Sequence, residues 1–74
     1  MTKKELIEHL RKTLPVMWER IRTDELTGGV IKARRLANLS CQDKGPGGTF
    51  RCGRKVVMTR EAFLEWLAGS IEEL

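Results

Sequence analysis

The sequence of 74 residues has only two cysteines and no long apolar run. Cys41 and Cys52 are too few for the disulfide framework of a small secreted domain, and a reducing compartment would keep both as thiols. No stretch approaches the roughly 18 apolar residues of a membrane span, and the N-terminus lacks the apolar segment of a signal peptide. These absences favour a cytoplasmic protein without a membrane partner.

The motifs of catalysis, metal binding and nucleotide binding are also missing. His9, Cys41 and Cys52 show none of the paired spacings of a structural zinc site, which takes four protein ligands. No pattern places an acidic residue to orient His9 as the base of a nucleophilic cysteine. The glycine-rich residues 45–48 match neither the Walker sequence nor the dinucleotide fingerprint. A chain of this length also leaves little room for a large cleft, so we expect no enzyme, metal, cofactor or small-molecule substrate.

Positive charge, by contrast, is concentrated in one part of the chain. Residues 32–60 carry eight basic side chains and one acidic side chain, whereas residues 61–74 carry four acidic side chains and no basic one. The formal net charge of the whole chain is +4. Clustered Lys and Arg raise the local potential and release counterions from a phosphate backbone, so nucleic acid is the first partner to consider. Phe50 alone offers few aromatic surfaces for unpaired RNA bases, which favours double-stranded DNA over RNA.

The spacing of apolar residues predicts one mainly α-helical domain over residues 1–74. Residues 1–14 form an additional N-terminal helix, which begins with the capping-box pattern of Thr2 and Glu5. Pro15 ends this helix or opens a further helical turn, and a weaker helical pattern follows from Val16.

Residues 16–40 are then expected to form a helix-turn-helix. Thr23 is the expected N-cap of a short helix, and Gly28 and Gly29 stop it because glycine adopts positive φ without strain. A second helix runs from Lys32 to about Ser40, and its basic side is exposed.

The remaining residues predict a small hairpin and a last helix. Residues 49–58 read as two short strands joined at Gly53 and Arg54, which makes a two-stranded β wing. Residues 59–74 read as a C-terminal helix that Thr59 caps and whose apolar residues, including Trp66 and Leu74, pack the core. The predicted fold class is therefore a winged helix-turn-helix.

The order of these motifs resembles the excisionase and AlpA-like regulators of phages and mobile elements, which are related to the DNA-binding domain of MerR regulators. The resemblance spans about residues 16–68 and rests on five segments: 26–31 (LTGGVI), 36–39 (LANL), 45–46 (GP), 52–56 (CGRKV) and 63–67 (FLEWL). It implies that the second helix enters the major groove and that the wing reaches toward the backbone or the minor groove.

On this pattern eight residues are candidate DNA contacts. The recognition helix would present Lys32, Arg34, Arg35 and Asn38, and the wing would present Arg51, Arg54 and Lys55, with Lys44 between them. Arg can make two hydrogen bonds to guanine and Asn can do the same with adenine, so Arg35 and Asn38, one turn apart, suit base reading. A solvated helix face, with Asn38 closing the helix end, is the alternative interpretation of these residues.

These features predict a sequence-specific DNA-binding protein of phage or mobile-element type. It would act as a transcriptional regulator or as an excisionase-like recombination directionality factor, in the cytoplasm and associated with the nucleoid. Its expected partner is double-stranded DNA, with a second copy of itself or a phage integrase as further candidates. The alternative is a protein-interaction module on a winged-helix scaffold that has lost DNA binding and meets an acidic protein surface.

Overall fold

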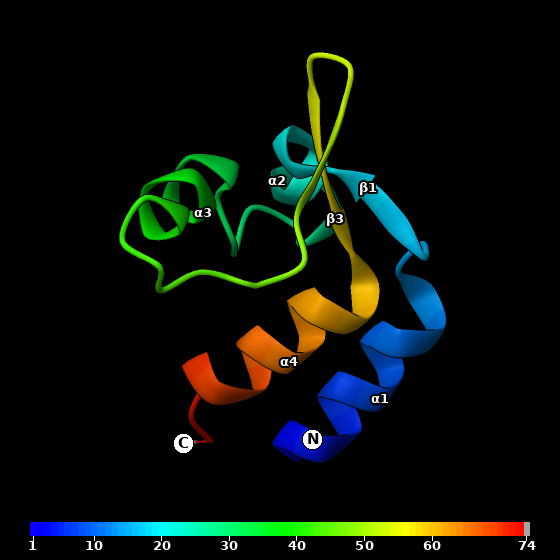
Figure 1. The fold of residues 1–74 in the computed structure, drawn as a ribbon. Coiled ribbons are helices and arrows are strands. Elements are labelled where there is room, and N and C mark those ends of the chain that lie inside the picture. The colour runs from blue at the N-terminus through cyan, green and yellow to red at the C-terminus, as the bar shows by residue number, and fades with distance from the viewer. Residues whose placement is uncertain (74) are drawn as a thin grey trace.

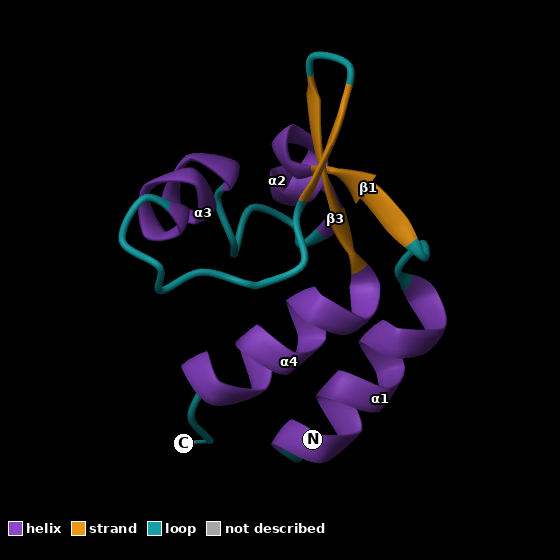
Figure 2. Ribbon diagram, viewed as in Figure 1, coloured by secondary structure: helices purple, strands orange, loops and turns teal. Residues whose placement is uncertain are grey.

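The computed structural model describes residues 1–73 and is mainly α-helical, with one small antiparallel sheet, as predicted (Figure 1; Figure 2). In chain order the elements are α1 (Lys3–Thr13), β1 (Met17–Glu19), the 3-10 turn η1 (Arg20–Arg22), α2 (Thr23–Leu26), α3 (Ala33–Ser40), β2 (Phe50–Cys52), β3 (Lys55–Thr59) and α4 (Arg60–Ser70). Within the described residues no helix has the length and apolar character needed to cross a membrane.

Helix α1 begins and ends where the sequence predicts. The Thr2 hydroxyl accepts a hydrogen bond from the backbone N–H of Glu5, and the Glu5 carboxylate accepts from the backbone N–H of Thr2, which completes the capping box. At the other end Leu14 is extended (φ −77°, ψ 146°) because the following proline disfavours helical backbone.

The segment after Pro15 differs from the prediction, because residues 17–19 form a strand and not a helical turn. Strand β1 pairs with β3 in antiparallel register, with Met17 opposite Thr59 and Trp18 opposite Met58. The Trp18 side chain is buried in the core while Met17 remains exposed, the alternation expected of a half-buried strand. Extended backbone after the proline and a partner strand far along the chain therefore override the weak helical pattern.

The connection from α2 to α3 has the predicted glycine turn, with φ of 64° at Gly28 and 83° at Gly29. Thr23, however, is not the N-cap of α2, a position that Arg22 occupies. Thr23 is fully buried, and its hydroxyl accepts a hydrogen bond from Trp18 Nε1 at 2.9 Å and donates one to the Arg20 carbonyl oxygen at 2.8 Å. Thr23 therefore supplies the hydrogen-bond acceptor for the buried Trp18 indole N–H and does not cap the helix.

Strands β2 and β3 form the predicted hairpin, which stands out from the body of the molecule (Figure 1). Gly53 at its tip has a φ of 64°, which the tight turn requires. The prediction of only two strands is wrong, because β1 adds a third strand and the order is β1-β3-β2. Pairing on both sides of β3 anchors the base of the hairpin to the core.

Helix α4 lies beside α1 (Figure 1). The Thr59 hydroxyl caps α4 by accepting from the backbone N–H of Ala62, as predicted. The helix ends at Ser70, so the prediction of helix through residues 71–73 is wrong, and Leu74 lies outside the described residues. Two features favour this earlier end: Gly69 weakens the last turn, and the Glu73 carboxylate accepts from the backbone N–H of Lys3.

The core lies between the sheet and helices α1, α3 and α4. Phe63 is completely buried and meets Trp18 edge to face, with ring centroids 5.3 Å apart. Trp66, predicted to be core, is only partly buried and packs against the edge of this cluster. The buried members are Leu14, Trp18, Ile31, Leu36, Met58, Phe63, Leu64 and Leu67.

Candidate nucleic-acid interface

Helix α3 buries one side chain and leaves its polar side exposed. Leu36 is 1% exposed and anchors the helix in the core, whereas Arg34, Arg35 and Asn38 are all exposed. These three and the preceding Lys32 line one shallow hollow, together with Leu39 and Asp24. The structure thus brings together the four residues predicted for the recognition helix.

Asp24 of α2 and Thr27, which follows α2, hold the first turn of α3 and the loop before it. Asp24 Oδ1 accepts a hydrogen bond from the Ala33 backbone N–H at 2.7 Å, and Asp24 Oδ2 lies 3.8 Å from Lys32 Nζ. The Thr27 hydroxyl accepts from the backbone N–H of Ile31 at 3.0 Å and donates to the Thr23 carbonyl oxygen at 2.8 Å. The orientation of α3 is therefore fixed by polar contacts as well as by Leu36.

Asp24 was not singled out by the sequence. Its partners lie eight and nine residues further on, across the glycine turn, and this spacing belongs to no capping motif. Only the three-dimensional path of the turn brings the carboxylate to α3.

The hairpin directs its basic residues in different directions. Arg51 lies opposite Val56, and side chains opposite one another in an antiparallel pair share a face. Because side chains alternate along a strand, Val56 shares its face with Met58, which packs in the core with Leu36 of α3. Arg51 is therefore on the side of the sheet that faces the core and α3.

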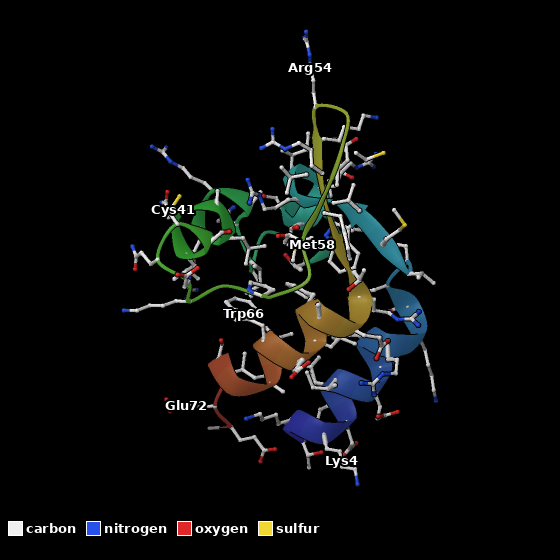
Figure 3. All side chains as sticks on the ribbon, in the orientation of Figure 1. Lys4, Cys41, Arg54, Met58, Trp66 and Glu72 are labelled. Carbon is white, nitrogen blue, oxygen red and sulfur yellow. The ribbon has the colours of Figure 1, made fainter. Side chains whose placement is uncertain are left out.

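Arg54 occupies the tip of the hairpin and Lys55 the opposite face of the sheet. The Arg54 side chain extends away from the rest of the molecule (Figure 3). Lys55 Nζ lies 3.3 Å from Glu19 Oε1, on the face that also carries Val57 and Phe50. The structure thus separates Lys55 from Arg51, two residues that the prediction grouped in one wing.

Lys44 lies apart from both groups. The Trp66 indole donates a hydrogen bond from Nε1 to the Lys44 carbonyl oxygen at 3.1 Å, and the Lys44 backbone N–H donates to the Leu39 carbonyl oxygen. These bonds place Lys44 beyond the C-terminal end of α3, in a hollow that it shares with Glu65 of α4. Lys44 therefore does not line the hollow at the start of α3.

All eight predicted residues are exposed, and most of them keep their charge free for a ligand. Over residues 1–73 only Lys32 and Lys55 among them form ion pairs, whereas Lys44, Arg34, Arg35, Arg51 and Arg54 form none. Exposed ion pairs contribute little, about 0–1 kcal/mol each, so a phosphate group can displace them. The arrangement is suited to binding an anionic, extended partner.

The perturbed ionisable groups lie elsewhere in the molecule. Hydrogen bonds from Arg60 and Arg11 hold the pKa of Glu61 below its ordinary value. A hydrogen bond to Glu25 and its negative charge raise the pKa of Arg22. Glu61 on α4 and Arg22 on η1 both form exposed ion pairs, and neither residue lines the hollow at α3.

The residues considered for metal or nucleophile chemistry are dispersed. His9 is exposed on α1, Cys41 follows α3 and Cys52 ends β2, and both thiols are free. Nowhere in residues 1–73 do three His, Cys, Asp or Glu side chains approach one another closely enough to hold a metal ion.

No protein-family model, curated protein or solved structure matches this chain.

Proposed function

We propose that this protein binds double-stranded DNA in a sequence-specific manner, as a winged helix-turn-helix protein of phage or mobile-element type. The observation that carries this proposal is the position of Arg51 and Arg54 relative to α3. Arg51 lies on the α3 side of the sheet, and Arg54 extends from the tip of the hairpin. Lys32 and three polar residues of α3 line one exposed hollow. A basic helix beside a basic hairpin presents two contact elements to one duplex.

The division of labour follows from side-chain chemistry. Arg35 and Asn38 lie one helical turn apart and can each make paired hydrogen bonds to a base edge in the major groove. Arg54 at the tip of a narrow hairpin suits a minor groove or the adjacent backbone. Arg51 would supply a phosphate contact that positions the helix, and Arg34 would read bases together with Arg35 and Asn38. No covalent chemistry is required of the protein.

The small size of the protein predicts that more than one copy binds. A single small DNA-binding module buries roughly 600–1,000 Å² of protein surface, less than most specific protein–DNA interfaces. Useful specificity therefore requires cooperative binding to neighbouring sites, dimerisation or a second protein such as a phage integrase. In this role the protein would act as a transcriptional regulator or as an excisionase-like directionality factor on the nucleoid.

The opposite face of the sheet favours a second candidate, a protein-interaction module that does not bind DNA. Phe50 is 61% exposed and Met17 is 56% exposed, and both lie on the sheet face away from the core. Exposed aromatic and methionine side chains are frequent in protein interfaces. In this case the basic surface would meet an acidic protein.

A titration of backbone amide NMR signals with a random duplex of about fifteen base pairs separates the two candidates, because phosphate contacts weaken steeply with salt. The DNA-binding proposal predicts shifts in residues 32–40 and 50–56 that are large at low salt and suppressed at physiological salt. Shifts that are absent at low salt would refute it and favour the interaction module. Signals of α1 provide an internal control, because that helix lies outside the proposed interface.

A further inference from the structure

Among the described residues, Asp24 is the one acidic residue that lines the hollow at α3. Within the described chain, the hollow at α3 is otherwise lined by Lys32, Arg34, Arg35, Asn38 and Leu39. Asp24 belongs to α2, and its side chain is 43% exposed at the place where α3 begins. An acidic group at this position opposes the proposed binding of a polyanion, so its presence requires an explanation.

One role of Asp24 is to cap α3 from another helix. The first backbone N–H groups of an α-helix have no partner within the helix, and Lys32 at the N-cap position supplies no side-chain hydrogen bond. Asp24 Oδ1 instead accepts from the Ala33 N–H at 2.7 Å. Because the acceptor belongs to α2, this bond fixes the start of α3 relative to α2 and not only to its own turn.

The second role of Asp24 concerns its charge. Asp24 Oδ2 lies 3.8 Å from Lys32 Nζ, so the carboxylate draws the ammonium group toward the protein. A phosphate that approaches the first turn of α3 would meet the carboxylate and would have to detach Lys32 from it. Both effects weaken backbone binding to any DNA sequence and leave the base-reading side chains Arg35 and Asn38 untouched.

We propose that Asp24 is a positioning residue of the DNA interface. Its hydrogen bond holds the first turn of α3 in register with α2, and its charge restrains Lys32 and keeps binding to arbitrary DNA weak. This inference rests on the proposed DNA-binding function, and its two parts can be tested separately.

The substitution Asp24→Asn separates charge from hydrogen bonding, because the amide oxygen still accepts from Ala33. Hydrogen exchange of the Ala33 amide is expected to stay as slow as in the unsubstituted protein. The affinity for a random duplex at low salt should rise by about fivefold, and one additional phosphate contact should steepen the salt dependence by about 0.9 in log–log slope. In a Lys32→Ala background the gain in slope should vanish.

The substitution Asp24→Ala removes the charge and the acceptor together. We expect Ala33 exchange to become about tenfold faster, the change that corresponds to one lost hydrogen bond of typical net strength. The matched control is Glu25→Gln, which removes the same charge one residue away. Glu25 is 65% exposed, pairs with Arg22 at 2.8 Å and lies outside the hollow at α3. This variant should leave Ala33 exchange and the salt slope unchanged.

Equal gains in affinity for Asp24→Asn and Glu25→Gln would show that only the net charge of the protein matters. This result would overturn the proposal that Asp24 restrains Lys32. Unchanged Ala33 exchange in Asp24→Ala would overturn the positioning of α3. A protein that binds no random duplex at low salt would refute the proposed function and, with it, the part concerning charge. Ala33 exchange would still decide the part concerning position, so the two failures are distinguishable.

Discussion

Helices α4 and α3 differ in how they are held to the same core. Helix α4 buries Phe63, Leu64 and Leu67, whereas α3 buries only Leu36. The start of α3 and the loop before it are instead fixed by backbone N–H groups that donate to the side chains of Asp24 and Thr27. A helix that packs through one residue makes a smaller apolar contact with the core. In return, most of its surface remains available to a partner.

The two strands of the hairpin repeat this contrast. Strand β3 buries Val57 and Met58 between two neighbouring strands, whereas every residue of β2 is exposed. Stability is thus expected to depend on α4 and β3, and recognition on α3, β2 and the tip of the hairpin. Substitutions in the two regions should consequently affect different measurements.

The largest effect on stability is expected for Phe63→Ala. This side chain is fully buried between Trp18 and Trp66, and truncating such an aromatic typically costs about 3–5 kcal/mol. Urea unfolding followed by circular dichroism would measure the loss. Phe50→Ala is the matched control on the exposed strand and should change stability by less than about 0.5 kcal/mol. A comparable loss in both variants would erase the contrast between β2 and the core.

Substitutions in the recognition region should change DNA binding without changing stability. Arg54→Ala should weaken binding to every duplex and reduce the salt slope by about 1, as expected for the loss of one backbone contact. Arg35→Ala should cost about 1–3 kcal/mol on a duplex selected for tight binding and much less on random DNA. Fluorescence anisotropy with both duplexes would measure the difference.

The control for these two variants is Lys12→Ala, which removes the same charge from the exposed end of α1. It should alter both affinities only slightly. If Arg35→Ala and Arg54→Ala changed specific and random binding in equal proportion, the helix and the hairpin would have no separate roles.

An intermediate effect on stability is expected for Thr23→Val, which preserves shape and removes the buried hydroxyl. The Trp18 indole N–H would lose its acceptor in the core, at a cost of about 1–2 kcal/mol. Thermal unfolding would measure this cost. Thr13→Val, at an exposed position of α1, removes a hydroxyl that donates to the His9 carbonyl oxygen and should be nearly neutral. Equal melting temperatures for the two variants would contradict the role of Thr23.

The smallest effect is expected for Glu61→Gln and should depend on pH. The lowered pKa of Glu61 means that the unfolded chain takes up this proton more readily than the folded chain. Its contribution to stability is therefore complete above the ordinary value of 4.5 and disappears as the pH falls through the lower folded-state pKa. The small difference in Tm between the two proteins should be present at neutral pH and should shrink in acid.

Locally determined elements were predictable from the sequence. The capping box of Thr2 and Glu5, the glycine turn at residues 28–29 and the hairpin tip at Gly53 each depend on residues close together in the chain. The exposure of all eight candidate residues also agrees with their charge and spacing. Their role in DNA binding stays a prediction.

Features that depend on distant partners were missed. Strand β1 is a strand because β3 lies beside it, and no pattern near Met17 reveals that neighbour. For the same reason the sequence did not show that Trp18 would be more deeply buried than Trp66, or that Asp24 would cap α3. The early end of α4 likewise involves Glu73 and the start of α1.

The pairing of β1 with β3 has a consequence for synthesis on the ribosome. Met17 cannot pair with Thr59, and α1 cannot pack against α4, until residues 59–70 have been synthesised. Until then the first half of the chain exposes Leu14 and Trp18, whose packing partners Met58 and Phe63 have not yet emerged. The domain consequently completes its core only after α4 has left the ribosome. A product truncated at the hairpin would lack half of the buried cluster, namely Met58, Phe63, Leu64 and Leu67.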